Sequence, residues 1–155
     1  MLSVNSMNIR EVDYTQLPLA MLLEADPSEK QVLSYLTRCH CFLAEADGEA
    51  VGVCAVLPLA DGMSYELMNI AVGPKQQGIG SKLLEGVIAI VKTMDTKRLL
   101  VGTGTFGCQL TFYQRAGFRV VSVDKDFFLR NYDEPIYEHG IQHKDMLRLE
   151  LRFDE

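Results

Sequence analysis

The chain has 155 residues, of which 48% are hydrophobic and 23% are charged, and its formal net charge is −6. This length and apolar content predict a single globular domain spanning residues 1–155, with a core that buries about 70% of the surface of the unfolded chain. The net negative charge argues against general binding to nucleic acid or to an anionic membrane.

The first half of the chain predicts a strand, two helices and three antiparallel strands. Asp26-Pro27 separates the two helices, and Ser28 can cap the second. Asp47-Gly48 joins two apolar runs in the manner of a β-hairpin, and Asp61-Gly62 marks a further reversal. In chain order the elements are 8–12, 14–25, 28–38, 40–46, 50–57 and 65–72.

The second half predicts a long amphipathic helix after Gly80, which returns the chain to a strand at 98–103 parallel to 65–72. A short helix over 107–115 then ends at Gly117, where a left-handed cap fits. Strands follow at 118–124 and 145–153, and these two are expected to pair antiparallel. Between them, residues 127–143 have no clean period.

No segment predicts a signal peptide or a membrane span. The N-terminus lacks a basic start followed by an apolar core. The longest apolar run, 51–60, is too short to cross a bilayer and is broken by Pro58. We therefore expect a cytoplasmic protein. The cysteines and histidines show no paired metal spacing, so we expect structural thiols and no metal.

Strand 65–72 alternates, which places Glu66 on a face with apolar neighbours. A carboxylate there is either at a solvated strand tip or desolvated, and desolvation raises its pKa toward that of a general base. The two sets that alternate are Tyr65, Leu67, Asn69 and Ala71 against Glu66, Met68, Ile70 and Val72.

The loop after this strand contains Gly78 and Gly80 and leads into a helix N-terminus, where unpaired N–H groups and the helix dipole favour an anion. An ordinary strand–turn–helix connection is the plainer interpretation. A Walker loop would need a lysine where Ile79 stands, and a dinucleotide fingerprint would need a glycine where Leu83 stands. The remaining interpretation is a phosphate site of another kind, beside Lys75.

The segment KQQGIGSKLL resembles the acetyl-CoA pyrophosphate loop of the GNAT (GCN5-related) N-acetyltransferases, whose pattern is Gln/Arg-x-x-Gly-x-Gly/Ala. Gly78 and Gly80 match the small positions, and Lys75 stands in place of Gln/Arg. MNIAV before the loop and FYQRAGF about thirty residues later strengthen the resemblance, which covers nearly the whole chain. It implies an α/β (α+β) fold with a mixed, mostly antiparallel central sheet of about seven strands flanked by about four helices.

The resemblance also implies how acetyl-CoA is held as co-substrate. The strand before the loop would pair with the pantetheine arm through its backbone, and the loop would hold the pyrophosphate. Gln109 would supply an amide contact, because Thr105 and Phe106 stand where the family commonly has an asparagine. The cofactor-binding residues expected are Asn69, Ile70, Ala71, Val72, Lys75, Gln76, Gln77, Gly78, Ile79, Gly80, Ser81 and Gln109.

For catalysis the resemblance assigns Glu66 as a base acting through water and Tyr113, in FYQRAGF, as the acid that protonates the leaving thiolate. By itself a helical tyrosine is more often a packing residue. The expected reaction is direct transfer of an acetyl group from acetyl-CoA to a primary amine, with Cys108 as the thiol near the site that could argue otherwise.

The acceptor is expected to be a small-molecule or peptide amine. Acidic residues around 124–138 suggest a cationic acceptor or, equally, a solvated surface. No nucleic acid or membrane partner is expected, and a homodimer is allowed. The alternative function is a non-catalytic acyl-CoA-binding sensor or interaction module. A nucleotide-binding module is disfavoured by the failed phosphate motifs.

Overall fold

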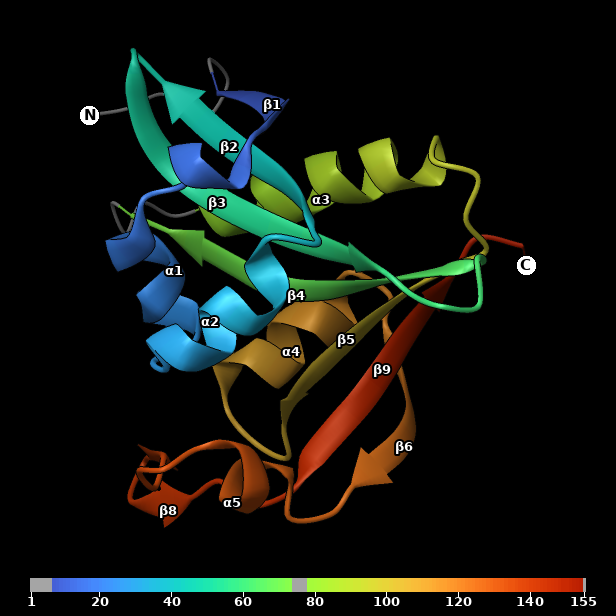
Figure 1. Ribbon diagram of the computed structural model, residues 1–155. Coiled ribbons are helices and arrows are strands. Elements are labelled where there is room, and N and C mark those ends of the chain that lie inside the picture. The colour runs from blue at the N-terminus through green and yellow to red at the C-terminus, as the bar shows by residue number, and fades with distance from the viewer. Residues whose placement is uncertain (1–6, 74–77, 155) are drawn as a thin grey trace.

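The computed structural model describes residues 7–73 and 78–154 and contains a seven-stranded sheet in the order β1-β2-β3-β4-β5-β9-β6 (Figure 1). Neighbouring strands are antiparallel except β4 and β5, which are parallel. The predicted mixed, mostly antiparallel sheet is thus confirmed. The strands are β1 (Asn8–Val12), β2 (His40–Ala46), β3 (Glu49–Pro58), β4 (Ser64–Val72), β5 (Arg98–Gly104), β6 (Arg119–Asp124) and β9 (Met146–Arg152).

Two of the predicted helix boundaries are confirmed by their capping residues. The Ser28 hydroxyl accepts a hydrogen bond from the Gln31 N–H at 3.2 Å and so caps α2. Gly117 follows α4 with a φ of 103°, the left-handed value expected of it. The helices are α1 (Leu19–Ala25), α2 (Glu29–Leu36), α3 (Ile79–Lys92), α4 (Cys108–Arg115) and α5 (Phe127–Asn131). Within the described ranges, none of them is both long and apolar enough to cross a membrane.

The boundaries of two segments differ from the expectation. The first helical stretch is divided: Tyr14–Gln16 forms a short 3₁₀ turn, and Pro18 is the N-cap of α1. The aperiodic segment 127–143 contains α5 and a small hairpin of β7 (Tyr137–Glu138) and β8 (Ile141–Gln142). In Figure 1 this excursion lies beyond the sheet, where β9 begins.

Each face of the sheet carries its own apolar core. On one face α1 and α2 pack through residues such as Leu22, Val32 and Leu36. On the other face α3 and α4 pack through residues such as Leu83, Val87 and Tyr113. The sheet therefore separates two layers, and β4 at its centre contributes side chains to both.

A β-bulge in β4 reverses the direction of its side chains. Ala55 of β3 pairs with Asn69, and Val56 pairs with Leu67, so Met68 is an extra residue on β4. Leu67 packs in the α3/α4 layer, whereas Met68 and Ala71 pack in the α1/α2 layer. The strict alternation predicted over 65–72 is therefore wrong beyond Met68.

This bulge corrects the neighbours assigned to Glu66. Ile70 and Val72 pack against the α3/α4 layer, not on the face that Glu66 shares with Met68. Asn69, which alternation would have placed beside Leu67, instead reaches the helices of the other layer. Its amide nitrogen donates to the Leu22 carbonyl at 2.9 Å and to the Tyr35 hydroxyl at 3.1 Å.

The parallel pair at the centre of the sheet opens partway along. β4 pairs with β5 from Ser64–Arg98 to Leu67–Val101 and no further, although β5 stays paired with β9 to Gly104. Figure 1 shows the two strands side by side at their beginnings and diverging toward their ends. Among the described residues, no strand therefore pairs with the edge of β4 that faces β5 beyond Leu67.

We predict that Asn69→Ala destabilises the fold by about 1–3 kcal/mol, because it leaves the buried Tyr35 hydroxyl and the Leu22 carbonyl short of a donor. Urea unfolding measures this change. Asn8→Ala is the matched control, since Asn8 is an exposed strand residue. Equal midpoints for the two variants would contradict a structural role for the Asn69 side chain.

Candidate active site

A cavity of about 760 Å³ lies between the free edge of β4, the start of α3 and α4. Its walls are mostly apolar, and polar groups converge on it from α3 and α4. The residues that line it are Ile70, Ala71, Val72, Gly80, Ser81, Leu84, Glu85, Cys108, Gln109, Thr111, Phe112, Arg115 and Ala116. This cavity brings together six of the predicted cofactor-binding residues: Ile70, Ala71, Val72, Gly80, Ser81 and Gln109.

Two glycines shape the entry to α3. Gly78 is its N-cap with a φ of 93°, a conformation that other residues rarely adopt. A Cβ on Gly80 would meet only the Phe112 ring at 3.7 Å, so Gly80 leaves the cavity open beside the first turn. The unpaired N–H groups of that turn and the dipole of a 14-residue helix favour an anion there.

The other predicted cofactor residues are placed differently. The Ile79 side chain is 2% exposed and belongs to the α3/α4 core, so only its backbone is available to a ligand. The Asn69 side chain points away toward α1 and α2. Lys75, Gln76 and Gln77 lie outside the described residues.

Tyr113 lies on α4 with its ring among Phe112, Phe118 and the sheet, and it is 4% exposed. Burial raises the pKa of its phenol, so the hydroxyl stays protonated at neutral pH. Two fully buried side-chain atoms lack a partner in the described part of the chain, Asn69 Oδ1 and His143 Nδ1; the Tyr113 hydroxyl is not one of them. Tyr113 therefore packs in the α3/α4 core, lines neither of the cavities described here, and keeps its proton at neutral pH.

A second cavity, of about 250 Å³, lies on the other side of the bulge. It is bounded by α2, β4, β5, α5 and the start of β9. The residues that line it are Asp26, Gln31, Ser34, Tyr35, Arg38, Leu57, Glu66, Leu67, Met68, Gly102, Phe127, Asn131, Tyr132, Met146 and Arg148. The two cavities border consecutive stretches of β4, 66–68 and 70–72.

Glu66 is held in the second cavity by an arginine. Arg148 Nη1 lies 3.2 Å from Glu66 Oε2, and Nη2 of the same guanidinium lies 3.2 Å from Asp124 Oδ2. The Glu66 side chain is 18% exposed. Burial raises its pKa above the ordinary value, and the charge and hydrogen bond of Arg148 oppose that rise.

Arg148 was not among the residues predicted for the site. The alternation of strand 145–153 placed it only on the outward side of the last strand. Its guanidinium also lies 5.6 Å from the centre of the Phe127 ring, on α5. One side chain therefore joins β4, β6, β9 and α5 around Glu66. Local sequence patterns do not predict such a long-range pairing.

Asp26 supports the same cavity through a hydrogen-bond network. Its carboxylate accepts from the Tyr132 hydroxyl at 3.0 Å and the Tyr35 hydroxyl at 3.4 Å, as well as from the Ser28 N–H at 3.3 Å. Burial raises the pKa of Asp26, and these hydrogen bonds oppose the rise. The network ties α2 to the segment after α5 and occupies the carboxylate.

The acids of the late excursion do not line either cavity. Asp124 binds Arg130 and Arg148, which hold its pKa below the usual range, and Glu138 Oε1 lies 2.9 Å from His143 Nε2.

Burial raises the pKa of Cys39 to about 12 and of Cys41 to about 11, so both thiols stay protonated at neutral pH. Cys108, in contrast, is exposed and borders the first cavity.

Comparison with known proteins supports the resemblance to the GNAT acetyltransferases. Residues 37–120 match the family profile described as the acetyltransferase (GNAT) domain. The chain is 42% identical over 134 residues to the uncharacterized N-acetyltransferase YvbK of Bacillus subtilis (strain 168), covering 84% of this chain and 86% of that protein.

Two solved structures share the fold closely. A GNAT family acetyltransferase from Elizabethkingia anophelis with acetyl-CoA bound has a TM-score of 0.90 and 38% identity, covering 96% of this chain and 99% of that one. A Bacillus subtilis acetyltransferase in complex with CoA has a TM-score of 0.86 and 37% identity, covering 95% and 99%.

We predict that Arg148→Met raises the pKa of Glu66 further, because the variant removes the cation that opposes the effect of burial. NMR titration of the side-chain carboxyl carbons measures it directly. Arg152→Met is the control, since Arg152 lies on the same strand and pairs with Glu150 and Asp154. A Glu66 pKa that stays the same or falls in Arg148→Met would show that the ion pair does not control this carboxyl.

Proposed function

The chain belongs to the GNAT acetyltransferase family, and on that premise we propose that it transfers the acetyl group of acetyl-CoA to a primary amine by direct attack. The observation that carries the proposal is the opening between β4 and β5. It gives a free strand edge beside a helix N-terminus on one side and a half-buried carboxylate, Glu66, on the other.

Acetyl-CoA is the co-substrate, and the first cavity suits its parts. The unpaired edge at Ile70–Val72 would hydrogen-bond the pantetheine arm as another strand would. The N–H groups at the start of α3, with Gly80 and Ser81, would receive the pyrophosphate. Gln109 at the start of α4 would add an amide contact to the arm.

Glu66 would act as the general base. An alkylammonium must become neutral before it can attack, and a lysine-like amine has a pKa of about 10.4. Burial raises the pKa of Glu66 while Arg148 restrains the rise, so the carboxylate is a stronger proton acceptor than a solvated glutamate. The second cavity, in which it lies, is the place for the acceptor.

In the reaction the amine nitrogen forms a bond to the thioester carbonyl carbon, and the carbon–sulfur bond breaks. The ammonium loses two protons: one is released through Glu66 and water, and one ends on the thiol. Tyr113 would donate a hydrogen bond or a proton to the departing sulfur, because burial keeps its phenol protonated.

We predict that Gly80→Asp abolishes acetyl-CoA binding without unfolding the protein. The new carboxylate would enter the first cavity and repel the pyrophosphate at the start of α3. In the wild type, acetyl-CoA at about a hundredfold excess over Kd should stabilise the fold by about 2.7 kcal/mol. Thermal shift measures both effects. Gly80→Ala is the control, as its methyl meets only the Phe112 ring. A full shift in Gly80→Asp would show that the pyrophosphate site is misplaced.

We predict that the wild type releases thiol from acetyl-CoA when amines are supplied, and that Glu66→Gln lowers kcat/KM by about 10²–10⁴-fold near neutral pH. Rising pH should partly rescue the variant, because bulk base then neutralises the amine. The wild-type profile should level off once Glu66 has ionised.

Two results would contradict this mechanism. Superimposable pH profiles of kcat/KM for the wild type and Glu66→Gln would show that Glu66 has a structural role. A burst of thiol that needs no amine and vanishes in Cys108→Ala would replace direct attack with an acyl-enzyme. Binding of acetyl-CoA without thiol release in any amine set would instead indicate a binding module.

A further inference from the structure

One guanidinium in the second cavity, that of Arg38, forms no ion pair with a carboxylate of the described residues. Arg38 follows the end of α2, and its Nη2 donates to the Ser34 carbonyl at 3.0 Å. Among the described residues no carboxylate lies within ion-pair distance of it, in contrast to Arg148 in the same cavity, which binds both Glu66 and Asp124. Most of the donors of Arg38 are thus available to a ligand.

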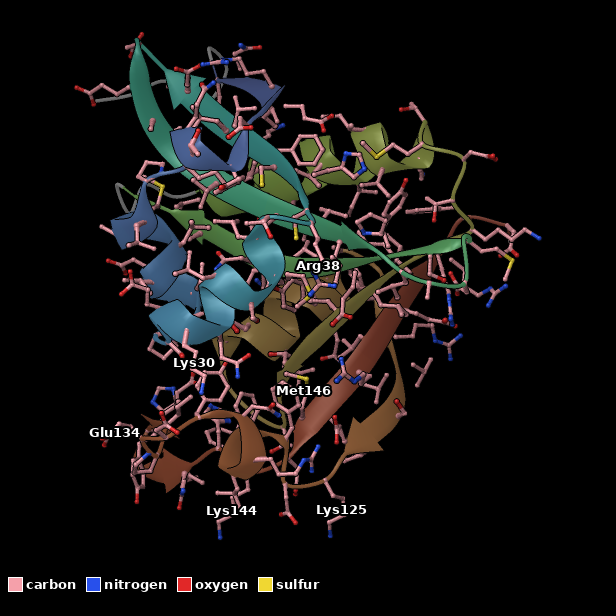
Figure 2. All side chains as sticks on the ribbon, viewed as in Figure 1. Lys30, Arg38, Lys125, Glu134, Lys144 and Met146 are labelled. Carbon is pink, nitrogen blue, oxygen red and sulfur yellow. The ribbon has the colours of Figure 1, made fainter. Side chains whose placement is uncertain are left out.

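The position of Arg38 is set by the face that α2 turns to the cavity. Gln31, Ser34, Tyr35 and Arg38 follow one another at helical spacing and all line it. Figure 2 shows Arg38 where α2 approaches β4, and Met146 where β9 begins; both border the cavity. Arg38 is exposed and Glu66 is largely enclosed, so the arginine lies toward the opening and the carboxylate toward the interior.

The acids of the cavity cannot satisfy Arg38. The oxygens of Asp26 accept hydrogen bonds from Tyr35, Tyr132 and the Ser28 N–H, and Glu66 is bound by Arg148. A guanidinium presents its donors in a planar fork that matches a carboxylate in a bidentate arrangement. An anionic group on the ligand would complete this site, whereas a second cation would be repelled.

The remaining walls describe the rest of the ligand. Leu57, Met68, Phe127 and Met146 supply apolar surface to the same cavity. The volume, about 250 Å³, suits one small molecule rather than a folded peptide segment. A ligand would therefore present an amine to Glu66 and an anionic group to Arg38, with its apolar part against these walls.

We propose that the acceptor is an amine that also carries a carboxylate, of the class of an apolar α-amino acid, and that Arg38 binds that carboxylate. This inference rests on the proposed function and adds its substrate class. It replaces the cationic acceptor suggested by the acids near 124–138, because those acids do not line the cavity. The chemistry of transfer is unchanged; Arg38 is a specificity-determining residue.

The test compares matched acceptors: phenylalanine against phenethylamine, and leucine against isoamylamine. Thiol release from acetyl-CoA gives kcat/KM for each. We expect the wild type to prefer the amino acid of each pair by about 10- to 100-fold, the range of a hydrogen-bonded charge pair. Arg38→Ala should bring the ratio close to one by raising KM for the amino acids, and Arg38→Lys should keep part of the preference.

Lys30→Ala is the matched control. The variant removes a positive charge from α2, the helix that Arg38 follows, but Lys30 does not line the cavity, so the preference of the variant should equal that of the wild type (Figure 2). Each variant should first show the wild-type thermal shift with acetyl-CoA, which establishes that the fold and the first cavity are intact.

The outcomes separate this inference from the proposed function. Thiol release with the simple amines at an equal or greater kcat/KM than with the amino acids would overturn the inference and leave the acetyltransferase intact. A preference that survives in Arg38→Ala would overturn the role of Arg38. Absence of thiol release with every compound would overturn the proposed function itself and the inference with it.

Discussion

The arrangement of this protein depends on the point at which β4 leaves β5. Pairing ends at Leu67, and the extra residue Met68 reverses the side-chain direction of β4 at the same place. The divergence frees a strand edge for a ligand, and the bulge directs Glu66 and Met68 into one cavity and Ile70 and Val72 toward the other layer. If β4 paired with β5 along its whole length, it would have no free edge for a ligand.

Two opposing effects act on the pKa of Glu66: burial of the carboxyl and its ion pair with Arg148. Burial alone would raise the pKa of the carboxyl, which makes it a better base but leaves less of it ionised. Arg148 limits the rise and shares its guanidinium with Asp124, and it also lies near the Phe127 ring of α5. Since removing one member of a partly buried pair leaves the other uncompensated, Arg148 links the stability of this region to the pKa of Glu66.

Local sequence patterns predicted the elements well, because caps and turns act over a few residues. Ser28, Asp47-Gly48 and Gly117 each mark a boundary that the structure contains. The bulge at Met68 was missed because it depends on the register with β3, which periodicity within β4 does not report. Arg148 was missed for a related reason: its partners lie 82 and 24 residues away in the chain. The short helix α5 lies in a segment without period, where packing rather than propensity decides the structure.

The two cavities of the candidate site also differ in how far their residues are separated along the sequence. Part of the first cavity is formed by the end of β4 and the start of α3, which are close in sequence, so a short motif can predict that part; the rest is formed by α4. The second is assembled from α2, β4, α5 and β9, whose residues come from both ends of the chain. No spacing can encode such a set. The choice of acceptor would therefore depend on tertiary structure, because it depends on which charged groups lack a partner after the chain has folded. In this cavity Asp26 and Glu66 are already engaged, and Arg38 is the cation that remains available to a substrate.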